Sequence, residues 1–370
     1  MANINDYLKW RGDIKVSSSY PLNELDYMIL SRFSYLPFDR ITLENEENAK
    51  SLYKKMQKFS NAVFLYNGDK EMLENMSKSA RFNEMIVTDF EFNFDKSIEK
   101  QFAAITIHLS NKAMFVSFCG TDRTITGWKE DFNLAYMENI PAQLDALEYL
   151  KKQAKKYNNK KIYIGGHSKG GNIAIYSAIK APKKLQKRIE MVANYDGPGF
   201  SKQMIDSIEN KEIIQKIHSV IPQESVIGRL LEHREKTYVV KSTEKGLYQH
   251  DIFSWEAQGT DIIKLSNVDK FSEVINDTVR SWLKKTTPDQ RKIFVDGIFS
   301  ILYSTEVATF KEFWSSILKN TPTIFRAYKD LNEKDRRMIT NMMKEFGKSY
   351  YSAIRSNNVK KRKEKKETTA

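Results

Sequence analysis

A serine between glycines, Ser168, is the residue whose surroundings most clearly indicate chemistry. The sequence there reads G-G-H-S-K-G-G over 165–171, after the apolar residues 162–164 and before a stretch rich in small and apolar residues. This pattern predicts a strand, a sharp turn and a helix. In such a turn the serine backbone is strained, and Gly166 and Gly170 leave space that side chains would fill. Ser168 is therefore a candidate nucleophile, and the N–H of Lys169 can stabilise an oxyanion; the alternative is a plain glycine-rich turn.

A serine nucleophile needs a histidine to accept its proton. The sequence has five candidates, namely His108, His167, His218, His233 and His250. His108 lies in a predicted strand, and His167 adjoins the serine with its side chain directed elsewhere. His218 enters an apolar run, and His233 lies among charged residues as a solvated side chain would. His250 follows the predicted strand 238–240 in a polar loop that can return over the end of a sheet, so we predict His250 as the base.

The acid that orients this histidine has two candidates. Asp196 follows the first predicted strand after the helix that begins at the serine, and Glu224 follows the next strand. Either carboxylate can reach a histidine in a later loop. Asp196 also has a structural interpretation, because aspartate commonly braces a turn such as its Gly-Pro-Gly neighbour, and Glu224 can equally be a surface residue.

A second oxyanion donor should come from a loop after an earlier strand. Residues 115–118 form an apolar run that leads into Cys119, Gly120 and Thr121. The backbone N–H and the hydroxyl of Thr121 are the candidates for this donor. A plain turn at the end of the strand is the alternative interpretation of the same residues.

These motifs resemble the class 3 lipases, the fungal triacylglycerol lipase group, over about residues 100–260. In that family a strand ends in Arg-Gly-Thr or Arg-Gly-Ser, a Trp and an Asp follow, and Gly-His-Ser-x-Gly-Gly comes later. This chain has Gly120-Thr121, then Trp128 and Asp131, then the serine motif. The N-terminal residues 7–31 are also similar to a group of uncharacterised bacterial lipase-like proteins.

The resemblance implies an α/β-hydrolase fold and a serine hydrolase that cleaves acyl esters of lipase or esterase type. It favours Glu224 as the acid, because the family's Asp follows the second strand beyond the serine. Three residues depart from the family: Cys119 replaces Arg, Glu224 replaces Asp, and Lys169 replaces the common Leu. The departures at Cys119 and Glu224 motivate an alternative, a weakened hydrolase-fold protein that binds or scaffolds instead of catalysing.

Hydrophobic spacing divides the chain into segments that would position these residues. Residues 101–260 alternate short β-branched or aromatic runs with longer mixed stretches, which predicts a mostly parallel sheet covered by helices. Residues 1–100 are expected to form a helical, lid-like segment packed on that core. Residues 261–358 show helical spacing of three and four, and the charged residues 359–370 are expected to be a disordered basic tail.

The charge is concentrated in the last third of the chain. The formal net charge is +13, of which +9 falls after residue 260. This surplus suggests an anionic membrane surface as a partner of the basic tail, in addition to an acyl-ester or lipid substrate. The sequence contains no recognised nucleic-acid motif, so no nucleic-acid partner is expected.

Composition narrows the remaining classes of protein. The single cysteine, Cys119, excludes an intramolecular disulfide framework and a multi-cysteine zinc site. No metal and no cofactor are expected, since the predicted triad needs neither. No apolar run reaches the roughly 18 residues of a spanning helix, and residues 1–10 lack the pattern of a secretory signal. We therefore expect a cytoplasmic protein, at most peripheral at a membrane.

Overall fold

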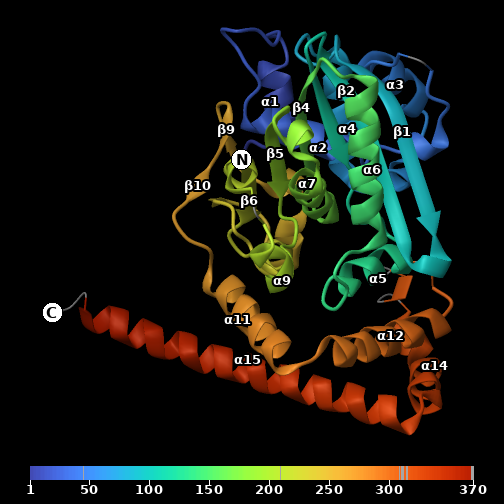
Figure 1. The fold of residues 1–370 in the computed structure, drawn as a ribbon, viewed down its shortest axis with the longest axis vertical. Coiled ribbons are helices and arrows are strands. Elements are labelled where there is room, and N and C mark those ends of the chain that lie inside the picture. Colours follow the sequence, from blue (N-terminus) through green and yellow to red (C-terminus); the bar gives the residue numbers. More distant parts are fainter. Residues whose placement is uncertain (45, 209, 308, 310–311, 314–315, 368–370) are drawn as a thin grey trace.

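An eight-stranded, mostly parallel sheet forms the centre of the protein (Figure 1). The structure is a computed structural model that describes residues 1–367 except 45, 209, 308, 310–311 and 314–315, with side chains up to residue 358. Strands β3 to β7 are parallel, whereas β1, β2 and β10 pair antiparallel with their neighbours. The spatial order is β1 (Ile86–Asp95), β2 (Lys100–Ser110), β3 (Ala113–Phe118), β4 (Lys161–His167), β5 (Ile189–Tyr195), β6 (Ile217–Pro222), β7 (Thr237–Val240) and β10 (Lys264–Leu265). The predicted sheet class is confirmed.

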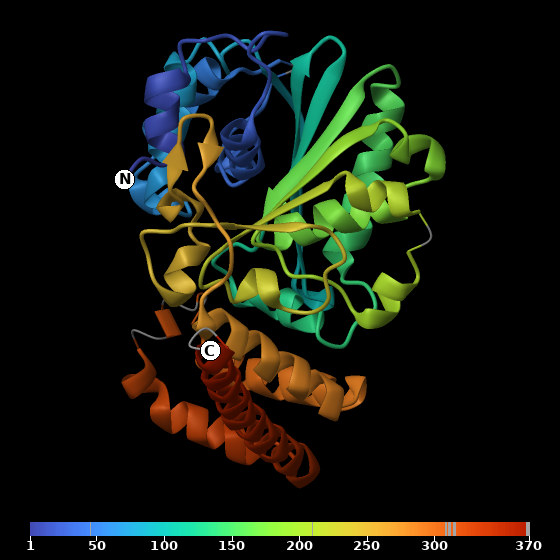
Figure 2. The same cartoon turned by 90° about the vertical axis from the view of Figure 1, so that its left-hand side faces the viewer.

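Helices cover both faces of this sheet, because successive strand residues point to opposite sides. On one face, Ile105, Phe115 and Tyr195 join a hydrophobic core with the N-terminal helices. On the other face, Val116, Ile164 and Val192 pack with α6 (Pro141–Lys156) and α7 (Lys169–Lys180). Figure 2 shows the sheet between these two layers, with the N-terminal helices in blue. The N-terminal helices are α1 (Ile4–Arg11), α2 (Glu24–Phe33), α3 (Ala49–Met56) and α4 (Asn67–Lys78).

The N-terminal segment packs on the core as expected, but it does not have the character of a lid. Its last strand, β1, belongs to the central sheet, and residues such as Leu25, Ile29 and Leu73 are completely buried. Two buried ion pairs, Arg32 with Asp69 and Arg81 with Asp26, fasten its helices to one another. Moving this segment away would expose a large part of the core, which a gating lid must avoid.

The functional loops meet at one edge of the sheet, because parallel strands all end on the same side. The loop after β3 leads into α5 (Ile125–Asn133), and β4 leads directly into α7. After β7 the chain forms a short 3-10 helix, Gly246–His250, near the same edge. This part of the chain also contains α8 (Lys183–Gln186), α9 (Lys202–Asp206), α10 (Lys211–Gln215) and a two-stranded sheet of β8 (Ala257–Gln258) and β9 (Asp261–Ile262).

The C-terminal helices lie beyond this carboxyl edge of the sheet (Figure 1). They comprise α11 (Lys270–Lys285), α12 (Pro288–Ser304), α14 (Ile317–Asp330) and α15 (Glu333–Glu367). The hydroxyl of Ser272 donates to the carbonyl of Ser225 at 2.5 Å, and Asp296 pairs with Lys129 of α5 at 3.0 Å. The helical region is therefore fastened to the loops that surround the serine turn.

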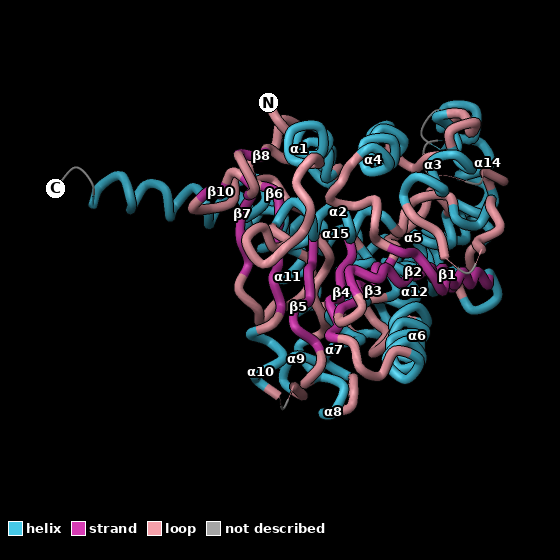
Figure 3. The backbone as a smooth tube through the Cα atoms, turned by 90° about the horizontal axis from the view of Figure 1, so that it is seen from above, coloured by secondary structure: helices cyan, strands magenta, loops and turns pink. Residues whose placement is uncertain are grey.

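The basic tail differs from its prediction. Residues 359–367 continue α15, which projects from the body of the protein (Figure 3), and residues 368–370 lie outside the described residues. Lysine, arginine and glutamate all have high helix propensity, so a preceding long helix can extend through them. The expectation of disorder depends on polarity alone.

Candidate active site

Ser168 occupies a strained turn between β4 and α7. Its backbone has φ 60° and ψ −133°, a left-handed conformation that costs on the order of 1–3 kcal/mol in a residue with a side chain. A Cβ atom at Gly166 would lie 2.3 Å from the carbonyl carbon of Gly170, and one at Gly170 would lie 2.3 Å from the carbonyl oxygen of Phe118. Both positions thus require glycine, as the motif predicts. A strained turn of this kind between a strand and a helix exposes the serine Oγ at the edge of the sheet, as a nucleophile requires.

His250 is paired with Asp196. Its Nδ1 lies 2.6 Å from Oδ2 of Asp196, and the carboxylate is almost completely buried. The second oxygen, Oδ1, accepts the hydroxyl of Ser225 at 2.5 Å and the backbone N–H of Gly228 at 3.1 Å. These bonds fix the carboxylate, so it holds the imidazole with hydrogen on Nδ1 and leaves Nε2 as the nitrogen that can accept a proton.

Glu224 is bonded to the neighbours of His250, and no hydrogen bond or ion pair joins these two described residues. Its carboxylate accepts the backbone N–H of Gly246, and its own N–H donates to Oε1 of Gln249 at 2.9 Å. The preference for Glu224 as the acid therefore disagrees with the structure, which brings Asp196 to the histidine. Glu224 instead anchors the 3-10 helix that carries His250. The left-handed backbone of Asp196, with φ 53°, turns its side chain toward that helix at the end of β5.

Thr121 lies in the loop after β3, and its hydroxyl donates to Oδ2 of Asp131. Burial raises the pKa of Asp131 to about 6, although Lys169 and the bond from Thr121 oppose this rise. Asp131 is therefore mostly ionised above neutral pH, and the Thr121 hydroxyl is committed to it. Within the described residues, neither the backbone N–H of Thr121 nor that of Lys169 donates to another group, so both amides can bind an oxyanion.

The side chain of Lys169 forms a buried ion pair that the sequence did not reveal. Its Nζ lies 2.7 Å from Oε2 of Glu130 and 2.7 Å from each of the two oxygens of Gln101, and both members of the ion pair are fully buried. Burial alone would lower the pKa of Lys169, but Glu130 and Asp131 reverse this effect and raise it, so the ammonium stays charged. A lysine where an apolar residue is usual is itself the signal, because a buried charge requires a partner.

Replacing Lys169 with methionine should destabilise the fold, because it leaves the Glu130 carboxylate buried without its ammonium partner. The expected loss in the free energy of unfolding is about 3–5 kcal/mol, measured by urea denaturation. The double variant Lys169→Met, Glu130→Gln removes both charges and keeps one acceptor oxygen, enough for one of the two backbone N–H groups, of Gln101 and Ala142, that donate to the two oxygens of Glu130. It should be more stable than Lys169→Met alone; equal or lower stability would contradict this account of the pair.

His250 and Ser168 are not hydrogen-bonded within the part of the chain that the structure describes. The hydroxyl of Ser168 and the imidazole of His250 both come from loops at the carboxyl edge, and Ser168 is 9% exposed. Hydrogen bonds at catalytic sites are often long before a substrate binds. Of the other histidines, His167 contacts His250 itself. The remaining three are engaged elsewhere: His218 pairs with Glu24, His233 with Glu235, and His108 with Thr88 and Lys160. His233 is thus paired instead of solvated.

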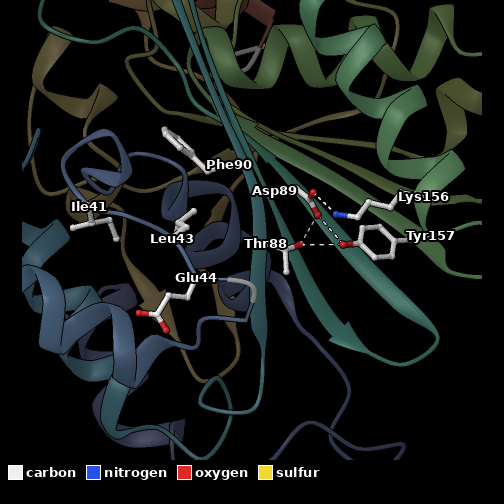
Figure 4. Close-up of a pocket in the computed structure, with 8 residues that line it drawn as sticks. All are labelled: Ile41, Leu43, Glu44, Thr88, Asp89, Phe90, Lys156 and Tyr157. Atoms are coloured by element: carbon white, nitrogen blue, oxygen red, sulfur yellow. Dashed lines mark hydrogen bonds and ion pairs between the residues drawn. The ribbon is translucent and has the colours of Figure 1, made fainter.

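A pocket of about 410 Å³ lies away from these residues, against the edge strand β1. Figure 4 shows Asp89 in its wall, bonded to Lys156, Tyr157 and Thr88. The other lining residues are Ile41, Leu43, Glu44 and Phe90. The carboxylate of Asp89 is thus engaged by three neighbouring side chains, and Ser168 does not line this pocket.

Among the side chains that the structure describes, no group of three or more His, Cys, Asp or Glu is arranged to hold a metal ion. The same part of the chain contains no helix long and apolar enough to cross a membrane. Cys119 is buried, and burial raises the pKa of its thiol to about 12, so it is not a nucleophile near neutral pH.

The sheet, the strained serine and the covering helices define a lipase-like α/β-hydrolase fold. The chain belongs to the Mbeg1-like family, whose sequence profile matches residues 76–300. No curated protein matches the sequence. Among solved structures, a deletion mutant of Rhizomucor miehei lipase with its propeptide has 12% identity and a TM-score of 0.40, covering 67% of this chain and 81% of that one. The Lip2 lipase from Yarrowia lipolytica has 11% identity and a TM-score of 0.36, covering 67% and 87%.

Proposed function

We propose that this protein is a serine hydrolase of lipase or esterase type that cleaves an acyl ester. The observation that carries the proposal is the pairing of His250 with a buried, fixed Asp196 at the same sheet edge as the strained Ser168. A carboxylate, an imidazole and a serine in this chain order of serine, acid and histidine are the parts that α/β-hydrolases use.

In the proposed reaction, Nε2 of His250 takes the proton of Ser168 while Oγ attacks the carbonyl carbon of the ester. The charge that develops on the carbonyl oxygen is held by the N–H groups of Lys169 and Thr121. When the tetrahedral intermediate collapses, the C–O bond to the alcohol breaks and His250 returns the proton to the leaving oxygen. A water molecule then attacks the acyl-serine with His250 again as base, which releases the acid and restores Ser168.

The binding or scaffold alternative loses its main support in the structure. This alternative rested on two departures from the lipase motifs, at Glu224 and at Cys119. The departure at Glu224 loses its weight, because the carboxylate paired with His250 is that of Asp196. The other, Cys119, is a buried and unreactive residue of the strand end, whose backbone N–H donates to Ala103 at 2.9 Å. Neither departure now removes a part of the proposed machinery.

A panel of p-nitrophenyl esters with short and long acyl chains tests this proposal with the full chain. We expect hydrolysis of at least one ester, with a preference between chain lengths that defines the acyl site. Matching thioesters and anilides separate ester hydrolysis from related acyl transfers, because the triad chemistry is shared among them. Absence of turnover on every acyl substrate would contradict the proposal.

Association of the basic residues 359–370 with an anionic membrane, and a cytoplasmic location, stay predictions. Each basic residue near an anionic bilayer contributes about 1 kcal/mol to binding, so the net charge of +4 in these residues should matter at low salt. Co-sedimentation with phosphatidylserine vesicles should fall when the chain ends at residue 358. Unchanged co-sedimentation would contradict a role of the tail.

A further inference from the structure

His167 has no role in the reaction proposed above, yet it is buried between the base and the N-terminal segment. We propose that His167 is a positioning residue for His250, holding the backbone of the base through its own imidazole. This inference rests on the proposed function, since it assigns a role in orienting the base of that same site.

The imidazole of His167 contacts His250 directly. Its Nε2 lies 2.7 Å from the backbone carbonyl oxygen of His250, and the two ring centroids are 4.5 Å apart with an interplanar angle of 33°. A carbonyl oxygen only accepts hydrogen bonds, so Nε2 of His167 must carry the hydrogen. The bond therefore selects one tautomer of His167 and joins the residue before the nucleophile to the residue that would activate it.

Tyr35 lies against the opposite side of the ring and bonds to the backbone of the same residue. The hydroxyl of Tyr35 lies 3.3 Å from Nδ1 of His167 and donates to the backbone carbonyl of His167 at 2.9 Å. Burial, together with the neighbouring His250 and Arg32, keeps the pKa of His167 well below its ordinary value. His167 thus stays neutral, and a neutral ring beside His250 does not oppose the positive charge that His250 acquires when it takes a proton.

Tyr35 is itself fixed by a buried charge. The guanidinium of Arg32 lies 3.8 Å from the centre of the Tyr35 ring and forms two hydrogen bonds, of 2.6 and 2.7 Å, with Asp69. Arg32 and Asp69 are both completely buried. The N-terminal segment therefore has a place in the site: it supports His167, and through it His250.

A second side chain holds the adjoining carbonyl of the same loop. The indole N–H of Trp255 donates to the carbonyl of Gln249 at 2.7 Å. The 3-10 helix that carries His250 is thus fixed at two successive carbonyls, one by Trp255 and one by His167. If the bond from His167 is lost, the peptide of His250 can rotate while Trp255 keeps the loop folded, so the expected defect is misorientation of the base and not collapse of the loop.

The test compares His167→Leu with His167→Gln in the full chain. Leucine fills the space without a donor, whereas the amide nitrogen of glutamine can reach the position of Nε2 and donate to the same carbonyl. On the best ester of the panel, His167→Leu should lower kcat roughly 10²-fold, the loss that a small misplacement of a catalytic group causes, with KM within about threefold. His167→Gln should recover most of this loss.

A second variant, Tyr35→Phe, keeps the ring on Arg32 and removes only the hydroxyl that faces His167. It should lower kcat by about threefold to tenfold without a change in KM. Amide hydrogen exchange of residues 246–251 supplies a measurement that needs no activity: exchange should rise in His167→Leu and return to the wild-type rate in His167→Gln.

Equal kcat in the wild type and His167→Leu would overturn the inference while leaving the proposed function intact. Loss of kcat that glutamine does not restore would also overturn it, because His167 would then be needed only for packing. If the wild type hydrolyses no acyl substrate, the proposed function fails first. Unchanged exchange of residues 246–251 in His167→Leu would then refute the positioning contact independently.

Discussion

Replacing Ser168 with alanine should lower kcat for ester hydrolysis by roughly 10⁴- to 10⁶-fold, the range expected when a catalytic nucleophile is removed. The proposed reaction passes through an acyl group on Oγ. Two nearby side chains are poorly suited to replace it: His167 is committed to His250, and the Cys119 thiol is buried with a pKa raised to about 12. Steady-state kinetics on the best ester of the panel measures the effect.

The Ser168→Ala protein should remain folded, because alanine keeps the Cβ and meets the same left-handed backbone as serine. Its urea midpoint should therefore lie close to that of the wild type, and the kinetic loss can be read as chemical. Full esterase activity in a purified Ser168→Ala protein would refute the assignment of the nucleophile.

The second large effect is expected at Asp196. Replacing it with asparagine keeps a side-chain oxygen for Ser225 and Gly228 but presents an amide N–H to Nδ1 of His250. The histidine must then place its hydrogen on Nε2, the nitrogen that should accept the proton of Ser168. A wrong tautomer of this kind lowers kcat by about 10⁴-fold in a well-studied serine protease, and we expect a similar loss here, measured on the same ester.

Glu224→Gln is the matched control for this variant, since it makes the same change of carboxylate to amide in the other candidate acid. Its side-chain oxygen can still accept the N–H of Gly246, so the activity loss should stay below about tenfold. If Glu224→Gln lost more activity than Asp196→Asn, Asp196 would not be the acid and the sequence-based preference for Glu224 would be restored.

The contrast between these two carboxylates shows what sequence could and could not predict. Local pattern was sufficient for the turn at Ser168, because the strand, the glycine-flanked serine and the helix follow one another directly in the sequence, although Gly170 is also required by the close approach of Phe118 from β3. The acid depends on which of two loops reaches His250, and this is decided by the left-handed backbone of Asp196 and by bonds from Ser225 and Gly228. No local pattern encodes those contacts.

The same reasoning explains the other differences. The roles of His167 and Lys169 depend on partners far away in sequence, Tyr35 and Glu130. The sequence gives a sign of only one of these roles, because a lysine at position 169 is unusual. Helical spacing predicts a lid-like N-terminal segment, but such spacing does not distinguish a mobile cover from a buried layer. Its buried ion pairs show that it is a layer of the core.

Spacing alone predicts the C-terminal helices, and the structure adds where they lie relative to the proposed site. They are fastened to the loop of Ser225 and to α5, which carries Asp131 and Glu130. Asp131 in turn accepts the hydroxyl of Thr121, so this region adjoins the proposed oxyanion site through two successive contacts. The concentration of positive charge in the last third of the chain therefore belongs to a region that borders the site.

Labelling with a fluorophosphonate probe, followed by mapping of the modified residue, tests the central claim most directly. Such probes react quickly only with a serine whose hydroxyl is activated by a neighbouring base. We predict a single rapid modification of the native protein, located at Ser168, which is lost in Ser168→Ala and slowed strongly in Asp196→Asn. A native protein that remains unlabelled, or that is labelled at another residue, would contradict the account.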